Sequence, residues 1–125
     1  MKVLADTHTL VWALRTPDLL SSPARAAMDA GEVMASVASL WELCLKCRKR
    51  DSLVLDPIAW WSQYVTNSGI RTLPIRVSDI AALCSLPEIH KDPFDRILVA
   101  QSMAEAIPLI TKDAALTQYG ISTIW

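Results

Sequence analysis

The stretch Val3-Leu4-Ala5-Asp6-Thr7-His8 joins a short apolar run, typical of a buried β-strand, to an acidic residue where a helix is predicted to begin. Three more segments place an acid at or just after such a transition. They are residues 36–42, 92–96 and 109–113, and the four acids are Asp6, Glu42, Asp95 and Asp113. This recurrence decides both the expected fold and the expected site.

Apolar runs that suit strands alternate with helical segments along the chain. Strands are expected at 3–5, 33–36, 70–75, 109–111 and 121–124. Helices are expected at 9–14, 22–30, 38–49, 58–66, 78–84, 93–106 and 114–119, with Ser22 as the cap of the second. The alternation predicts an α/β fold in three layers, α/β/α, with a central parallel sheet of about five strands.

The four acids are expected to meet at one edge of this sheet. Right-handed crossovers place every strand-to-helix turn on the same edge, where ligands of open α/β sheets bind. Asp6 and Asp113 would lie there directly, and Glu42 and Asp95 would point there from the first turns of their helices. Unneutralised carboxylates gathered in one place repel one another. A Mg²⁺ or Mn²⁺ ion, which prefers hard oxygen ligands, would remove that penalty.

Taken singly, each acid also has a structural explanation. Asp6 and Asp113 are suitable helix caps, and Glu42 can pair with Lys46 one turn later. Capping and local pairing do not require the carboxylates to converge, so the combined pattern favours a metal site.

The dipeptide Asp92-Pro93 is a common helix start. It would place Asp95 at the third helical position, where negative charge suits the helix dipole. Asp92 is therefore expected to cap the helix and support the site rather than bind metal directly.

Composition bounds the class of protein. The chain has 125 residues with 52% hydrophobic content, enough for a single domain, residues 1–125, with a real core. It shows no signal peptide and no apolar run long enough to span a bilayer, so a soluble cytoplasmic protein is expected. The net charge of −1 gives no global basic field.

A local basic cluster follows the second acid. Lys46, Arg48, Lys49 and Arg50 can complement the end of a helix or bind phosphate, and the sequence leaves both open.

Cysteine and histidine offer weaker signals. Cys44 and Cys47 form a C-x-x-C pair, but they follow the spacing of a buried helical stripe, so packing is favoured over redox or zinc chemistry. His8 and His90 are interpreted as loop or surface residues. The tryptophans of the predicted helices are interpreted as core or interface residues.

Four blocks of this chain resemble the PIN domain family, and more narrowly the VapC-type toxins of bacterial toxin–antitoxin pairs. The most specific block runs His90-Lys91-Asp92-Pro93-Phe94-Asp95-Arg96-Ile97-Leu98-Val99-Ala100-Gln101. The others are residues 4–8, 36–43 and 109–113. Their order and spacing extend the resemblance over nearly the whole chain.

The resemblance implies a metal-dependent endoribonuclease that blocks translation. It assigns metal binding and catalysis to the four acids and support of the site to Thr111. Arg96 and Lys46 match residues of the family motifs, and they are interpreted either as contacts for substrate phosphate or as partners in intramolecular ion pairs. It also implies a small antitoxin whose C-terminal segment covers the active-site groove, and a homodimer, for which the Trp60-Trp61 pair offers permissive support. Many relatives have a glycine where this chain has Lys49-Arg50-Asp51, which affects the local loop shape.

Two other classes are compatible with parts of the pattern. A catalytically silent PIN-like binding module would keep the fold without binding metal. A phospho-acceptor receiver domain is also doubly wound, but it needs paired acids after the first strand, where Asp6 stands alone.

Overall fold

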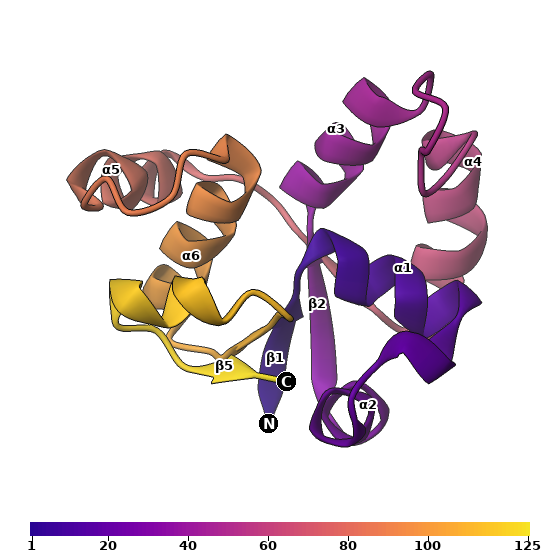
Figure 1. The fold of residues 1–125 in the computed structure, drawn as a ribbon, viewed down its shortest axis with the longest axis horizontal. Coiled ribbons are helices and arrows are strands. Elements are labelled where there is room, and N and C mark those ends of the chain that lie inside the picture. Colours follow the sequence, from indigo (N-terminus) through magenta and orange to yellow (C-terminus); the bar gives the residue numbers. More distant parts are fainter.

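The computed structural model describes all 125 residues and contains a five-stranded, wholly parallel sheet with helices on both faces (Figure 1). The strands are β1 (Lys2–Ala5), β2 (Glu32–Ser36), β3 (Arg71–Leu73), β4 (Leu109–Ile110) and β5 (Thr123–Ile124). Their spatial order is β3-β2-β1-β4-β5. The predicted fold class is confirmed. The order differs from the 2-1-3-4-5 order of receiver-type folds, which removes that alternative.

Helices connect the strands on both sides. The longer ones are α1 (Thr7–Arg15), α2 (Ser22–Ala30), α3 (Val37–Lys46), α5 (Val77–Ser85) and α6 (Pro93–Glu105). Shorter ones are η1 (Pro17–Leu19), α4 (Pro57–Trp60), η2 (Trp61–Val65), η3 (Thr66–Ser68) and η4 (Ala114–Tyr119). None of them is long and apolar enough to cross a membrane.

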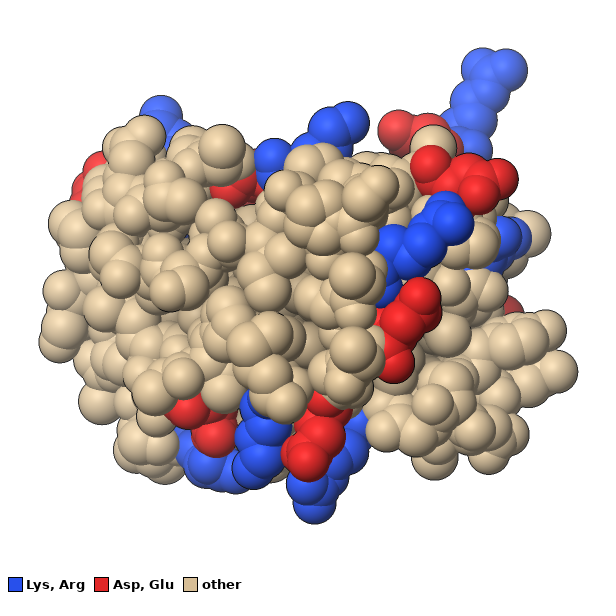
Figure 2. All heavy atoms as spheres, turned by 90° about the horizontal axis from the view of Figure 1, so that it is seen from below, with Lys and Arg blue, Asp and Glu red and all other residues tan.

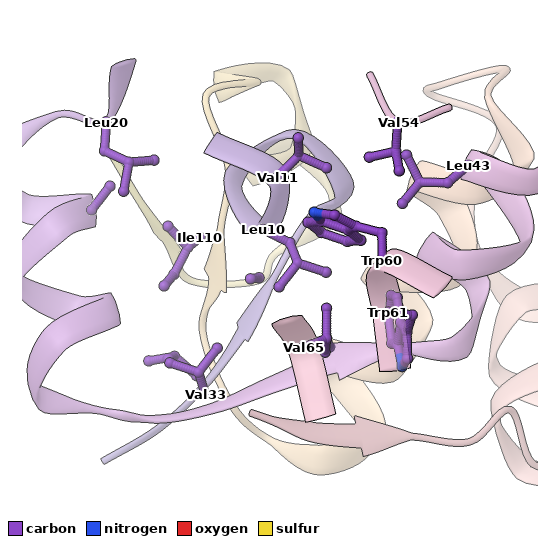
Figure 3. Close-up of a cluster of buried hydrophobic side chains, with 14 residues drawn as sticks. Leu10, Val11, Leu20, Val33, Leu43, Val54, Trp60, Trp61, Val65 and Ile110 are labelled. Carbon is purple, nitrogen blue, oxygen red and sulfur yellow. The ribbon is translucent and has the colours of Figure 1, made fainter. Parts of the chain in front are cut away.

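The alternation of side chains along β1 divides the core in two. Val3 and Ala5 face the cluster under α1, α2 and α4, whereas Leu4 faces the cluster under α6. Figure 3 shows the first cluster, in which Trp60 and Trp61 pack near Leu10 of α1. Both tryptophans are buried, at 7% and 6% exposure, so they are core residues and offer nothing to a partner.

Several element boundaries differ from the prediction for local reasons. Helix α3 begins at Val37 because the Ser36 hydroxyl accepts a hydrogen bond from the Ala38 amide, and it ends at Lys46. Glu42 therefore lies in its second turn rather than its first. Ser21, not Ser22, caps α2. The segment predicted as one helix at 58–66 is a short α-turn followed by a π-turn and a 3₁₀ turn, ended by Gly69 in the left-handed conformation.

The cysteines are reduced and carry no site. Cys44 and Cys47 are half-buried and Cys84 is exposed, and none is in a disulfide. No group of side chains positioned to hold a metal ion contains a cysteine.

The order in which the chain adds strands to the sheet reverses at β1. From β1 the chain reaches β2 and β3 on one side and, later, β4 and β5 on the other. The crevice at the carboxyl ends of β1 and β4 is thus the topological switch point, where such sheets bind ligands. Asp6 follows β1 there, and Asp113 follows β4.

Candidate metal centre

A polar pocket of about 380 Å³ lies at this switch point. Five carboxylates line it: Asp6, Glu42, Asp92, Asp95 and Asp113. They come from the ends of β1 and β4, the second turn of α3 and the beginning of α6. The structure therefore brings all four acids predicted from the sequence to one place, and Asp92 with them.

Asp6 and Asp113 act as helix caps and still face the pocket. Asp6 Oδ1 accepts a hydrogen bond from the Thr9 amide at 2.8 Å, and Asp113 Oδ1 accepts one from the Ala115 amide at 3.0 Å. In each residue the cap engages Oδ1 and fixes the carboxylate. The second oxygen of Asp6 has no protein partner, and that of Asp113 meets a histidine. Capping and ligand binding are thus compatible in both residues.

Glu42 is held differently, because protein groups engage both of its oxygens. Oε1 accepts a 2.6 Å hydrogen bond from the Thr7 hydroxyl, and Oε2 forms a 2.6 Å ion pair with Lys46 Nζ. The Glu42 side chain is only 8% exposed, whereas that of Lys46 is 43% exposed. The hydrogen bond to Glu42 raises the pKa of the Lys46 ammonium. Glu42 is therefore neutralised from within the chain.

Asp95 carries the strongest electrostatic penalty of the pocket. Burial raises the pKa of its carboxyl group to about 7, and the charges of Asp92, Glu42 and Asp6 add to this, while His90 opposes it. Asp92 caps α6 as predicted, with Oδ1 accepting from the Phe94 amide at 2.8 Å. The Asp95 carboxylate is therefore disfavoured first by its burial and then by the negative charges around it.

His90 is part of this site, which the sequence interpretation missed. Its Nε2 lies 3.1 Å from Asp113 Oδ2 and 3.6 Å from Asp95 Oδ2, while its Nδ1 accepts from the Asp92 amide at 3.2 Å. The tautomer that satisfies both sides carries its proton on Nε2. Atoms of His90, Asp95 and Asp113 lie within 4.8 Å of one another, as those of a metal-binding group would. The spacing of His90 two residues before the capping Asp92 was the available signal.

Of the supporting residues predicted from the sequence, Thr111 and Lys46 belong to the site and Arg96 lies outside the pocket. Thr111 is buried, and its hydroxyl accepts a 3.1 Å hydrogen bond from the Asp113 amide, which orients that acid. Lys46 lines the pocket. Arg96 does not. Its guanidinium donates to the Pro87 carbonyl at 2.8 Å and to the Tyr119 hydroxyl at 3.2 Å.

Four other lining residues were not assigned to the site from the sequence: Thr7, Lys112, Trp12 and His8, which was interpreted as a loop or surface residue. Thr7 holds Glu42, Lys112 adds an exposed cation, and Trp12 contributes an aromatic ring. Thr7 and Lys112 are each adjacent in sequence to one of the acids. Trp12 lies one helical turn from His8, and periodicity alone would place it in the core.

The chemistry of the donors fits a hard divalent cation. Carboxylate oxygens dominate the pocket, no cysteine lines it, and His8 is the one histidine among its ten lining residues. A bound cation would also offset the burial and the neighbouring negative charges that raise the pKa of Asp95 to about 7. Charge is not gathered this way at the opposite end of the sheet. Figure 2 shows that end, where acidic and basic side chains lie side by side around a largely uncharged face.

Comparison with known proteins places the chain beside one family. Residues 3–121 match the profile of the PIN domain. A curated relative, Ribonuclease VapC22 from Mycobacterium tuberculosis, is 31% identical over 120 residues, a match that covers 94% of this chain and 91% of the relative.

Solved structures share the fold at lower identity. VapBC2 from Rickettsia felis, bound to a DNA fragment from its promoter, superposes with a TM-score of 0.71 at 12% identity, covering 98% of this chain and 97% of that one. VapC20 from Mycobacterium tuberculosis, described as a sarcin–ricin loop cleaving toxin, gives a TM-score of 0.66 at 17% identity, with 95% coverage of both chains. FitAcB from Neisseria gonorrhoeae gives 0.69 at 16% identity, with 97% and 95% coverage.

Proposed function

Since the chain belongs to the PIN domain family, we propose that it is a Mg²⁺- or Mn²⁺-dependent endoribonuclease of the VapC type. In this proposal it is the toxin of a toxin–antitoxin pair and inhibits translation by hydrolysing phosphodiester bonds of RNA. One observation carries the proposal: five carboxylates share one pocket at the switch point of the sheet, where burial, together with the charges of its neighbours, raises the pKa of Asp95 to about 7. The similarity to Ribonuclease VapC22 supports RNA as the substrate.

Asp6, Asp95 and Glu42 are the proposed principal ligands of the ion. When bound, a divalent ion supplies positive charge for the scissile phosphate and makes water a stronger nucleophile at neutral pH. Asp6 is pre-oriented by its cap to the Thr9 amide, which leaves its second oxygen for the ion. Glu42 must exchange at least part of its pairing with Lys46 to take this role.

Asp113 and His90 are proposed to orient the attacking water or to complete a second ion site. The Thr111 hydroxyl and the Ala115 amide fix the position of Asp113. His90 Nε2 contacts both Asp113 and Asp95 and limits how far the two carboxylates can move apart or together.

Lys46 and Lys112 are the cations that can face a substrate phosphate in the pocket. If Glu42 turns towards an ion, the Lys46 ammonium gains freedom to pair with the phosphate. Arg96 has a structural role in this proposal, because its guanidinium ties the loop before α6 to Tyr119.

The partners proposed are an antitoxin whose C-terminal segment covers the pocket, and a second copy of this chain. Several solved structures of this fold are toxin–antitoxin complexes. Large apolar side chains are available on the surface, among them Leu55 at 84% and Val77 at 87% exposure.

The decisive experiment incubates the purified, antitoxin-free chain with total cellular RNA in Mg²⁺ or in EDTA, beside an Asp6→Asn variant. Discrete, metal-dependent cuts that the variant does not make are expected. If Asp6→Asn cut at the wild-type rate, the ligand assignment would be wrong. A folded chain that neither cuts RNA nor binds Mn²⁺ would instead be a silent PIN-like binding module.

A further inference from the structure

The pocket has an aromatic wall that the proposed metal chemistry does not use. Trp12 is the one apolar residue among the ten that line the pocket, and His8 lines it beside Trp12. The two ring centroids are 5.4 Å apart in an edge-to-face arrangement. A large aromatic ring among carboxylates and lysines is unexpected if the pocket receives only ions and water.

The wall is rigidly placed relative to the acids. Both rings project from α1, one turn apart, and the first residue before this helix is the capping Asp6. Trp12 also packs against the core cluster under α1 and lies 6.0 Å from the ring of Trp125. The Trp12 ring already packs against the core, so stacking a ligand on it costs little side-chain entropy.

An RNA bound at this site must present more than its scissile phosphate. The carboxylates, with their ion, account for the phosphate, and the attached nucleoside must occupy the neighbouring part of the pocket. Proteins recognise unpaired RNA bases by stacking them on Trp, Tyr, Phe or His rings. Bases inside a duplex already stack on one another and cannot reach such a ring.

We propose that Trp12, with His8, forms a stacking subsite that positions the base adjoining the scissile phosphate. This inference rests on the proposed ribonuclease function and assigns a substrate-positioning residue to that same site. Trp12 is a positioning residue, because stacking on its ring stabilises the bound substrate and the transition state equally.

The test combines a change in the protein with a change in the substrate. A short RNA spanning a cut mapped in total RNA is made intact or with an abasic ribose at a nucleotide adjoining the cut. Trp12→Leu keeps an apolar side chain against the core but removes the ring, and Trp12→Phe keeps a ring. Trp41→Leu is the matched control, because Trp41 is exposed, contacts Phe94 and lies outside the pocket.

With intact RNA, Trp12→Leu is expected to raise KM by roughly 5- to 100-fold with kcat nearly unchanged, since base–aromatic stacking acts on ground and transition states alike. For the wild type, replacing the intact RNA by the abasic RNA should raise KM by a similar factor. For Trp12→Leu, the same replacement should raise KM little further. Trp12→Phe should retain most of the affinity, and Trp41→Leu should show the wild-type dependence on the base.

Other outcomes overturn the inference. One is a wild type indifferent to the abasic change. Another is a Trp12→Leu variant whose KM rises by the same factor on the intact and the abasic RNA. A third is a Trp12→Leu variant with unchanged cleavage kinetics and weaker binding of the antitoxin. Circular dichroism and Mn²⁺-dependent melting identify a variant that fails to fold, and Trp12→Phe then carries the test. If the wild type cuts no RNA at all, the proposed function fails, which is a different result from cleavage without dependence on the base.

Discussion

Glu42 and Asp95 face the same pocket, but the chain treats their charges in opposite ways. Glu42 is buried with both oxygens engaged, one by the Thr7 hydroxyl and one by Lys46. The side chain of Asp95 meets only His90, at 3.6 Å, and its burial, together with the charge of Asp92, raises its pKa to about 7. One half of the pocket is thus neutralised by the protein, and the other half is left for an external cation. The difference indicates that a cation in this pocket would be drawn first to Asp95, and that Glu42 would join it as a ligand only by giving up part of its pairing with Lys46.

The sharpest test of this division is Asp95→Asn, compared with Glu42→Gln. Asp95→Asn should reduce metal-dependent RNA cleavage by more than about 100-fold, because loss of a ligand exceeds the roughly 10- to 100-fold cost of losing an outer-shell partner. It should also abolish the Mn²⁺-induced rise in melting temperature. In the wild type that rise corresponds to about 2.7 kcal/mol when the free ion exceeds its Kd by 100-fold.

Glu42→Gln should keep more of the Mn²⁺ stabilisation than Asp95→Asn, because Glu42 is already paired in the free chain. Calorimetry and melting curves in Mn²⁺ and EDTA measure both variants. Equal loss in the two variants would remove the distinction between the two halves of the pocket.

Lys46→Met removes the cation that neutralises Glu42 and leaves Asp95 and its neighbours unchanged. It leaves the buried Glu42 carboxylate with only its hydrogen bond to Thr7, which should destabilise the ion-free chain by about 1–3 kcal/mol. Mn²⁺ should then stabilise Lys46→Met by more than it stabilises the wild type, because the ion replaces the missing cation. The double variant Lys46→Met/Glu42→Gln serves as the control, and it should recover most of the stability in EDTA. Urea unfolding with and without Mn²⁺ provides the measurement.

The unneutralised half predicts an unusual pH dependence of the ion-free chain. The folded-state pKa of Asp95 is about 7 against an ordinary value of 3.8, so between these values the folded chain binds a proton that the unfolded chain does not. Its contribution to stability is fully present below about pH 4 and is lost as pH rises through 7. After allowance for the partial exposure of the side chain, the loss is on the order of 1–2 kcal/mol.

Asp95→Asn isolates this contribution from the other titrating groups. In EDTA, the difference in unfolding free energy between Asp95→Asn and the wild type should grow in favour of the variant from pH 5 to pH 8. A difference that stays constant over this range would show that Asp95 ionises normally and that the pocket carries no such penalty.

The sequence was sufficient for the fold and for the convergence of the acids, since both depend on local patterns that topology then constrains. Strands β1 and β4 are buried apolar runs, and the switch point between them brings Asp6 and Asp113 together. Capping chemistry at Asp92 also followed from the Asp-Pro dipeptide alone. In each case the residue and its immediate neighbours carry the information.

Contacts between distant segments could not be predicted in the same way. His90 joins Asp113 across 23 residues, and Thr7 joins Glu42 across 35. The orientation of Arg96 depends on Pro87 and Tyr119, which lie on either side of it in sequence and meet only in the folded chain. Neither periodicity nor spacing indicates which of two nearby polar groups a long side chain contacts.

Arg96 supplies the smallest of the predicted effects and separates a role in structure from one in catalysis. Arg96→Met removes the hydrogen bonds to the Pro87 carbonyl and the Tyr119 hydroxyl and should lower the unfolding free energy by roughly 0.5–1.5 kcal/mol. Cleavage by the folded variant should stay within about 3-fold of wild type, because the guanidinium does not line the pocket. Arg96→Lys distinguishes the two roles further. It retains a positive charge for a phosphate but not the Nη1 nitrogen that donates to both oxygens. If Arg96 served the substrate, Lys would preserve activity better than Met, whereas a structural role makes the two variants alike in activity and both less stable than wild type.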